Sequence, residues 1–250
     1  MAQSNQINYL DQKTAQNTDL ELMNELGFSI DVLMELAGQS IAHSLFDANK
    51  NFHQNKINKY IFLAGVGNNG GDAIVAARHM KMLGKDCEVM IFREPNKDLI
   101  INLIKTCQAN KIKVSKFQDL LDENDSQKTQ ENLKNYFQNY DIIVDGIFGF
   151  SFKPPVRKPY DQILDYLKNS NNKPVFSIDI PSGWDVEQGN VDEQYFTPEY
   201  LISLTLPKLV AKKYQGKHYL GGRFIPQCMI EKYNWKVPEY PEDKTFVLLQ

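Results

Sequence analysis

Three stretches of this sequence place acidic or amide side chains directly after an apolar run. These side chains are, in chain order, Asn68, Asn69, Asp72, Asp145 and Asp179. Carboxylate and amide oxygens can accept hydrogen bonds or ligate a hard cation, and a carboxyl group can also transfer a proton. One such acid alone more often caps a turn, but several at equivalent positions indicate a shared site.

The first stretch, at 65–72, reads GVGNNGGD. Glycines allow a backbone to approach a ligand closely, and the N–H groups at a helix start attract anions, so the segment is typical of a phosphate-binding turn. A plain strand-to-helix turn capped by Asp72 would explain the glycines but not the paired Asn68 and Asn69. The segment is not the GxGxxG fingerprint, and no acid follows the next apolar run at Phe92 to hold a ribose. We therefore do not expect the usual cofactor pose of a dehydrogenase.

The second stretch continues past Asp145 into a loop, 146–153, that reads GIFGFSFK. Aromatic side chains between glycines are typical of a ligand-binding loop. The alternative is that Phe148, Phe150 and Phe152 pack beneath a sheet, and we expect this of at least one of them.

Apolar runs and amphipathic segments alternate along the chain from residue 60 onward. The predicted strands are 60–64, 87–92, 141–145, 174–180, 200–206 and an edge strand at 219–226, and the predicted helices are 72–83, 99–107 and 160–167. This order predicts an α/β fold, a Rossmann-like three-layer αβα sandwich with a mostly parallel central sheet. Ligands bind such sheets at the carboxyl ends of the strands, where the polar side chains described above would meet.

The length of 250 residues favours a single domain covering 1–250. Within it we expect N-terminal helices over 10–47, with Ser29 as the N-cap of the second, a Rossmann-like core over 59–226, and an irregular C-terminal tail over 227–250.

Charge and composition argue against several functional classes. A net charge of −3 provides no general attraction for nucleic acid or a membrane surface. The local basic stretch that starts at Lys208 could meet a diphosphate, although a solvated face is the simpler interpretation. Three cysteines without CxxC spacing suggest neither a disulfide framework nor a zinc site. No membrane span or targeting segment is evident, so we expect a cytoplasmic protein, with mitochondria as the alternative.

Six segments, in order, resemble the NAD(P)H-hydrate epimerases, the YjeF N-terminal domain family. They lie at 34–38, 67–72, 144–152, 177–185, 201–208 and 218–224. The resemblance implies an isomerase that interconverts the R and S epimers of NADHX and NADPHX, which are nicotinamide cofactors damaged by hydroxylation at C6. It also implies a homodimer and a separate S-specific dehydratase that completes the repair.

The resemblance also assigns roles to individual residues. The implied substrate-binding residues are Asn68, Asn69, Gly70, Gly71, Asp72, Gly149, Phe150, Ser151, Phe152, Lys153, Pro154, Pro155 and Asp179. Asp179 is the candidate acid/base, and Asn69, Asp145 and Ser182 would surround one potassium ion per subunit. Ala73 replaces a usual glycine, and Pro154-Pro155 replaces a usual glycine and acid. Because proline has no N–H donor, the second departure weakens the expected contacts of that loop.

The main alternative is a non-catalytic binding scaffold of the same fold, of the kind found in RNA-decapping assemblies or in lipoprotein binding. A scaffold would be expected to lose the acidic residues of the motifs. Here Asp72, Asp145 and Asp179 all stand in motif positions, which favours catalysis.

Overall fold

A single mixed sheet organises the chain in the computed structural model, which describes residues 7–169 and 173–250. The strands described are β1 (Lys59–Ala64), β2 (Asp86–Ile91), β3 (Lys113–Lys116), β4 (Ile142–Gly146), β5 (Val175–Ile178), β6 (Tyr200–Leu204), β7 (Lys217–Gly221) and β8 (Phe246–Leu248). Their order in the sheet is β3-β2-β1-β4-β5-β6-β7-β8, and all neighbours are parallel except β7 and β8. The mostly parallel sheet is confirmed.

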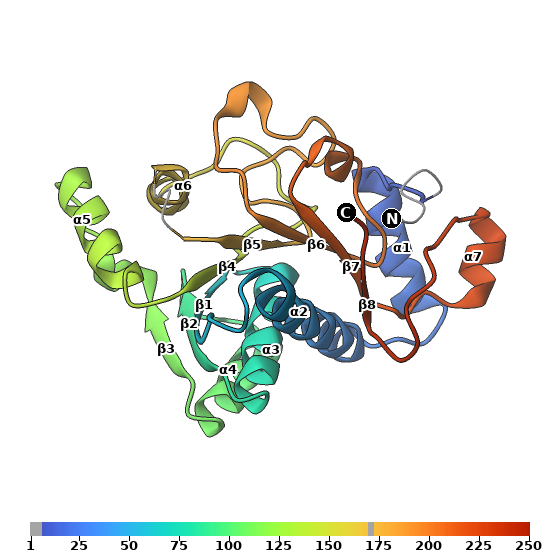
Figure 1. Ribbon diagram of the computed structural model, residues 1–250. Coiled ribbons are helices and arrows are strands. Elements are labelled where there is room, and N and C mark those ends of the chain that lie inside the picture. Colours follow the sequence, from blue (N-terminus) through green and yellow to red (C-terminus); the bar gives the residue numbers. More distant parts are fainter. Residues whose placement is uncertain (1–6, 170–172) are drawn as a thin grey trace.

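Helices cover both faces of this sheet (Figure 1). The helices described are α1 (Gln12–Asn24), α2 (Ile30–Phe52), α3 (Asn68–Met82), α4 (Asp98–Ala109), α5 (Ser126–Phe137), α6 (Tyr160–Asn169) and α7 (Gln227–Tyr233). Helices α2, α3 and α4 lie on one face and α5 and α6 on the other, whereas α1 and α7 lie beyond β7 and β8 (Figure 1). The expected three-layer αβα sandwich is confirmed.

The central strands are buried on both faces, as the continuous apolar runs predict. In β1, Tyr60 and Phe62 belong to the apolar cluster with α2 and α3, while Ile61 and Leu63 belong to the cluster with α5 and α6. Successive side chains of a strand point to opposite faces, so one short run supplies both layers of the core. This packing holds the carboxyl ends of the strands rigidly in place.

Two helix boundaries differ from the predicted ones. Helix α2 begins after the N-cap Ser29, as predicted, but continues to Phe52. Its polar last turns are stable because the buried Asn49 side chain exchanges two hydrogen bonds with the backbone of Ile57. Helix α3 begins at Asn68, so the NNGGD segment is the first turn of the helix and not a preceding loop.

Three further elements, β3, α7 and β8, were not predicted from the sequence. Strand β3 has the sequence KVSK, which contains no apolar run because it is a short edge strand protected by its lysines. The tail 227–250, expected to be irregular, contains α7 and β8. Strand β8 covers β7, which is therefore not the edge strand that was expected.

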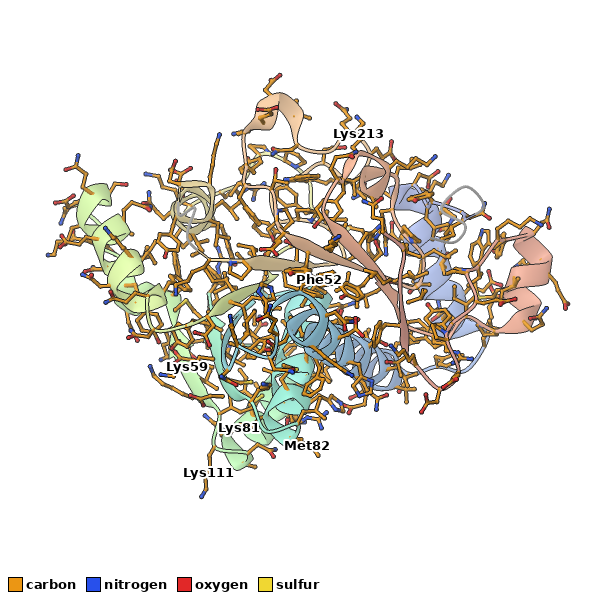
Figure 2. All side chains as sticks on the ribbon, viewed as in Figure 1. Phe52, Lys59, Lys81, Met82, Lys111 and Lys213 are labelled. Carbon is orange, nitrogen blue, oxygen red and sulfur yellow. The ribbon has the colours of Figure 1, made fainter. Side chains whose placement is uncertain are left out.

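The amino-terminal edge of the sheet is solvated. Figure 2 shows the side chains of Lys59, Met82 and Lys111 on the outside of the molecule, at the start of β1, in the last turn of α3 and just beyond the end of α4. In the part of the chain that the structure describes, no helix is both long and apolar enough to cross a membrane.

Candidate active site

A cavity of about 690 Å³ lies at the carboxyl ends of the parallel strands. Its walls come from α1, the first turn of α3, the loop 147–153 after β4, and the residues that follow β5 and β6. This is the place that the fold class predicted for a ligand.

A buried ion pair lies at the wall of the cavity. Asp179 follows β5, and its Oδ1 lies 2.6 Å from Nζ of Lys208. Asp179 Oδ2 accepts a hydrogen bond of 2.8 Å from the backbone N–H of Phe150, and Lys208 donates one of 2.9 Å to the carbonyl of Leu204. Both charged residues are buried, so the interpretation of Lys208 as part of a solvated face is wrong. The pair fixes the position of the Asp179 carboxylate.

Two neighbouring strand ends carry a left-handed backbone at this wall. Asp179 has φ of 68° and Thr205, directly after β6, has φ of 66°. Such a conformation is unfavourable for a β-branched residue, and strain of this kind concentrates at functional sites. The N–H of Asp179 donates a 2.7 Å hydrogen bond to the carbonyl of Ile202, which holds the two strand ends together.

Two further carboxyl groups face the same cavity, from Asp19 on α1 and Asp72 on α3. Burial raises the pKa of Asp19 to about 6, with Lys208 opposing the shift and Asp179 adding to it. Burial, and then the charges of Asp179 and Asp19, raise the pKa of Asp72 well above its ordinary value. Carboxyl groups with raised pKa values in one cavity are typical of an acid/base site.

Packing explains two of the glycines at the start of α3. A Cβ atom on Gly70 would lie 1.9 Å from the carbonyl oxygen of Gly65, and one on Gly71 would lie 2.5 Å from Sδ of Met34. Gly70 and Gly71 therefore lie behind the cavity wall, whereas Asn68 and Asp72 line it. The N-cap Gly67 provides no side-chain cap, which leaves the first N–H groups of α3 available to a ligand.

The aromatic loop is held against the cavity from α1. Gln12 Nε2 donates a 2.7 Å hydrogen bond to the carbonyl of Phe150. The Phe148 and Phe152 rings stack with their centroids 4.5 Å apart, and Phe148 also lies 5.0 Å from Tyr160 in the core. The expectation that at least one of these phenylalanines packs into the core is confirmed.

Asp145 lies behind the cavity and is completely buried. Its carboxylate accepts hydrogen bonds from Ser182 Oγ at 2.6 Å, Ser182 N at 2.9 Å and Ser177 Oγ at 2.8 Å, besides one from the N–H of Ile147 at 3.2 Å. Burial raises the pKa of Asp145, and the bonds from Ser182 and Ser177 oppose the shift. This carboxyl group orders the loops beneath the cavity.

Asn69 joins this network through Phe148. Its Nδ2 donates to the carbonyls of Phe148 at 2.9 Å and Ile178 at 3.2 Å, while the N–H of Phe148 donates to Ser182 Oγ at 2.9 Å. Asn69, Asp145 and Ser182, the three predicted cation ligands, thus form one connected cluster.

One atom of this cluster has no partner. Asn69 Oδ1 is buried and accepts no hydrogen bond from the described residues. An unsatisfied buried carbonyl oxygen is costly and suits an oxygen-ligated cation. No group of three or more His, Cys, Asp and Glu side chains suited to a metal occurs within residues 7–169 and 173–250. The amide, hydroxyl and carboxylate oxygens of the cluster are ligands of the type that a hard cation prefers.

Comparison with known proteins identifies the family. Residues 30–210 match the model of the YjeF-related protein N-terminus. The chain belongs to this family.

Similar proteins match it over nearly their whole length. A protein of Paramecium tetraurelia named NAD(P)H-hydrate epimerase is 47% identical over 251 residues, which is 100% of this chain and 99% of the relative. One of Aedes aegypti with the same name is 45% identical over 97% of this chain and 100% of its own length. The crystal structure of yeast ynu0, YNL200c, is 33% identical with a TM-score of 0.84, and the match covers 97% of this chain and all of the yeast chain.

In this YjeF-related chain the predicted site residues fall into two groups. Those that line the cavity are Asn68, Asn69, Asp72, Gly149, Phe150, Ser151, Phe152, Lys153 and Asp179. Those that do not are Gly70, Gly71, Asp145, Ser182 and the exposed Pro154 and Pro155. The roles of all these residues in binding stay predictions. Pro154 and Pro155, which replace a glycine and an acid usual in the family, do not line the cavity, so their lack of N–H donors matters less for a ligand there.

Two residues of the cavity were missed or misjudged from the sequence. Lys208 cannot be distinguished by sequence from the lysines that follow it. Its position four residues after the end of β6 nevertheless indicates that it lies near the other strand ends. Asp19 lies in α1 outside every motif, so no pattern in the sequence pointed to it.

Proposed function

We propose that the protein is an NAD(P)H-hydrate epimerase, which interconverts the R and S epimers of NADHX and NADPHX. The observation that carries the proposal is the Asp179 carboxylate, fixed by Lys208 at a strained strand end on the wall of a cavity of about 690 Å³. The two full-length relatives that bear this name support it. No comparable observation supports the binding scaffold.

The reaction needs a planar intermediate at C6 of the nicotinamide ring. C6 carries a hydroxyl group next to N1, so protonation of that hydroxyl lets it leave as water with the C6–O electron pair. The lone pair of N1 then forms a C6=N1 double bond. Water adds to the opposite face and releases its proton to solvent, which completes the inversion. Opening and closing of the ring would also pass through a planar C6 and would invert it in the same way.

Asp179 is proposed to donate a proton to the hydroxyl that leaves on its own face of the ring and, in the reverse direction, to accept one from the water that adds on that face, because a positioned carboxyl group can serve as both acid and base. The hydrogen bond from Phe150 and the ion pair with Lys208 restrict it to one orientation. Restricted orientation lowers the entropic cost of reaching the transition state.

The diphosphate of the substrate is proposed to lie at the start of α3. The first N–H groups of the helix, uncapped by Gly67, and the partial positive charge of the helix end favour an anion there. Lys97 and Lys153, which also line the cavity, are cations that could contact phosphate.

A bound potassium ion is part of the proposal. Asn69, Asp145 and Ser182 would hold it, and it would supply positive charge that satisfies the Asn69 oxygen and neutralises negative charge near the phosphates. These residues position the loops of the site and do not transfer the proton.

The oligomeric state and the coupled enzyme in the proposal depend on the family resemblance, whereas the compartment is the expectation from the sequence. The enzyme forms a homodimer, its product is consumed by a separate S-specific dehydratase, and both act in the cytoplasm, with mitochondria as the alternative compartment.

The direct test measures how fast R-NADPHX is consumed by an excess of S-specific dehydratase with ATP or ADP. Adding the purified protein is expected to accelerate consumption over the dehydratase alone, and Asp179→Asn is expected to remove the acceleration. A rate no faster than spontaneous epimerisation would overturn the proposal and favour the scaffold.

A further inference from the structure

Three carboxyl groups and one buried lysine lie close together at the cavity. Carboxyl groups face it from Asp19 on α1, Asp72 on α3 and Asp179 after β5, and Lys208 is the cation whose charge acts on all three. A neutral or anionic ligand group gains little from such surroundings, whereas a positive charge is stabilised.

Helix α1 presents one face to the cavity. The residues of that face are Gln12, Gln16, Asp19, Leu20 and Met23. These positions are separated by three or four residues, or are adjacent, which is the periodicity of one side of a helix. On the other side, Leu22 packs in a cluster with Met229 of α7 and Leu206 after β6. Asp19 is thus carried on a helix that is anchored at the end of the sheet (Figure 1).

The charge of Asp19 is not neutralised by a close partner. In the described part of the chain its carboxylate accepts no hydrogen bond and forms no ion pair within 4 Å. Lys208, which attracts it, is already held by Asp179 at 2.6 Å and by the carbonyl of Leu204 at 2.9 Å. With a pKa of about 6, the carboxyl group of Asp19 is mainly ionised at neutral pH and directs negative charge into the cavity.

We infer that Asp19 faces the nicotinamide ring and stabilises the positive charge that forms when the C6–O bond breaks. The inference rests on the proposed function, in which a neutral ring becomes a planar C6=N1 cation. An interaction that is stronger in the transition state than in the ground state raises kcat more than it lowers KM.

Two available dinucleotides test this charge directly. NADP⁺ has a planar cationic ring, whereas the ring of NADPH is neutral. In Asp19→Asn, which keeps the shape but removes the charge, the Kd of NADP⁺ is expected to rise about tenfold and that of NADPH to change less than about twofold. In the epimerase assay, kcat is expected to fall about tenfold or more, with a smaller change in KM.

The matched control is Glu131→Gln. It removes one negative charge from the exposed surface of α5, a helix that does not line the cavity. It is expected to leave the ratio of the two Kd values unchanged. Asp19→Glu retains the charge and is expected to keep the ratio within about threefold of the wild type. If Asp19→Asn does not fold, Asp19→Ala removes the same charge at a position where alanine favours the helix.

An unchanged ratio in the neutral variant, or equal weakening of both ligands, would overturn the inference even in an active epimerase. A shifted ratio in a protein without epimerase activity would support the role of Asp19 as a cation-binding residue and overturn the proposed function alone. The two failures are therefore distinguishable.

Discussion

Nζ of Lys208 lies 2.6 Å from Oδ1 of Asp179, and both side chains are at most 6% exposed. Lys208 is reached from the end of β6 and Asp179 from the end of β5, so the ion pair joins two adjacent strand ends at the cavity. Burial of one charge without the other is strongly unfavourable, which makes the pair a sensitive point of the molecule.

Replacing Lys208 by methionine should leave the Asp179 carboxylate buried without its counter-ion. We expect the free energy of unfolding to fall by about 3 kcal/mol, and the epimerase kcat to fall at least about 100-fold as the acid/base loses its orientation. Urea denaturation and the coupled dehydratase assay measure the two effects. Lys212→Met, at an exposed position of the same segment, is the control and should change neither quantity. Equal behaviour of the two variants would contradict the role of the pair.

Residue 70 must be glycine because there is no space for a side chain. A measurement of stability tests this requirement independently of ligand binding. A Cβ atom there would lie 1.9 Å from a backbone oxygen, which cannot move as a flexible side chain does. Gly70→Ala is therefore expected to lower the free energy of unfolding by about 2 to 3 kcal/mol. A Cβ atom on Gly67 would meet nothing within 4 Å, so Gly67→Ala should cost less than about 1 kcal/mol, the difference between glycine and alanine at an N-cap. Comparable losses in both variants would refute the packing explanation.

The unsatisfied oxygen of Asn69 predicts a stabilising effect of potassium. A ligand that binds only the folded chain raises its thermal midpoint, and we expect the midpoint to be a few degrees higher in KCl than in tetramethylammonium chloride at the same ionic strength. In Asn69→Ala the difference between the two salts should disappear. A wild-type midpoint that is the same in both salts would argue against a cation at Asn69, Asp145 and Ser182.

Burial of His218 predicts a loss of stability in mild acid. Burial lowers the pKa of His218 to about 4, and its Nε2 lies 2.9 Å from Ser203 Oγ. Because the folded pKa is below the unfolded value near 6.5, stability from this residue is fully present above pH 6.5 and is lost as the pH falls toward 4. The expected contribution is a decrease of about 2 kcal/mol in the free energy of unfolding between pH 7 and pH 5.

The measurement for His218 compares urea denaturation of the wild type and His218→Gln at both pH values. The carboxyl groups with raised pKa values, Asp19, Asp72 and Asp145, act in the opposite direction and are common to both proteins, so the difference isolates the histidine. A difference that does not change with pH would show that His218 is protonated equally in the folded and unfolded states.

Much of the fold could be predicted from the sequence because burial leaves a direct pattern in it. The apolar runs of β1, β4, β5 and β6 are continuous since these strands are covered on both faces. Edge strand β3 has no such run, and the end of α2 is polar. Strand β3 depends on its pairing with β2, and the last turns of α2 depend on the Asn49 hydrogen bonds. Local composition reveals neither interaction.

The sequence alone predicts that Asn69, Asp72, Asp145 and Asp179 lie at one edge of a parallel sheet, because parallel strands end on the same side. Which of these residues line the cavity, and which lie beneath it, depends on tertiary packing. The tertiary structure also brought Lys208 to Asp179, and Asp19 to the same cavity. These relationships arise from the packing of α1 and of the segment after β6 around the strand ends, and no periodicity within either segment encodes the partner that it will meet.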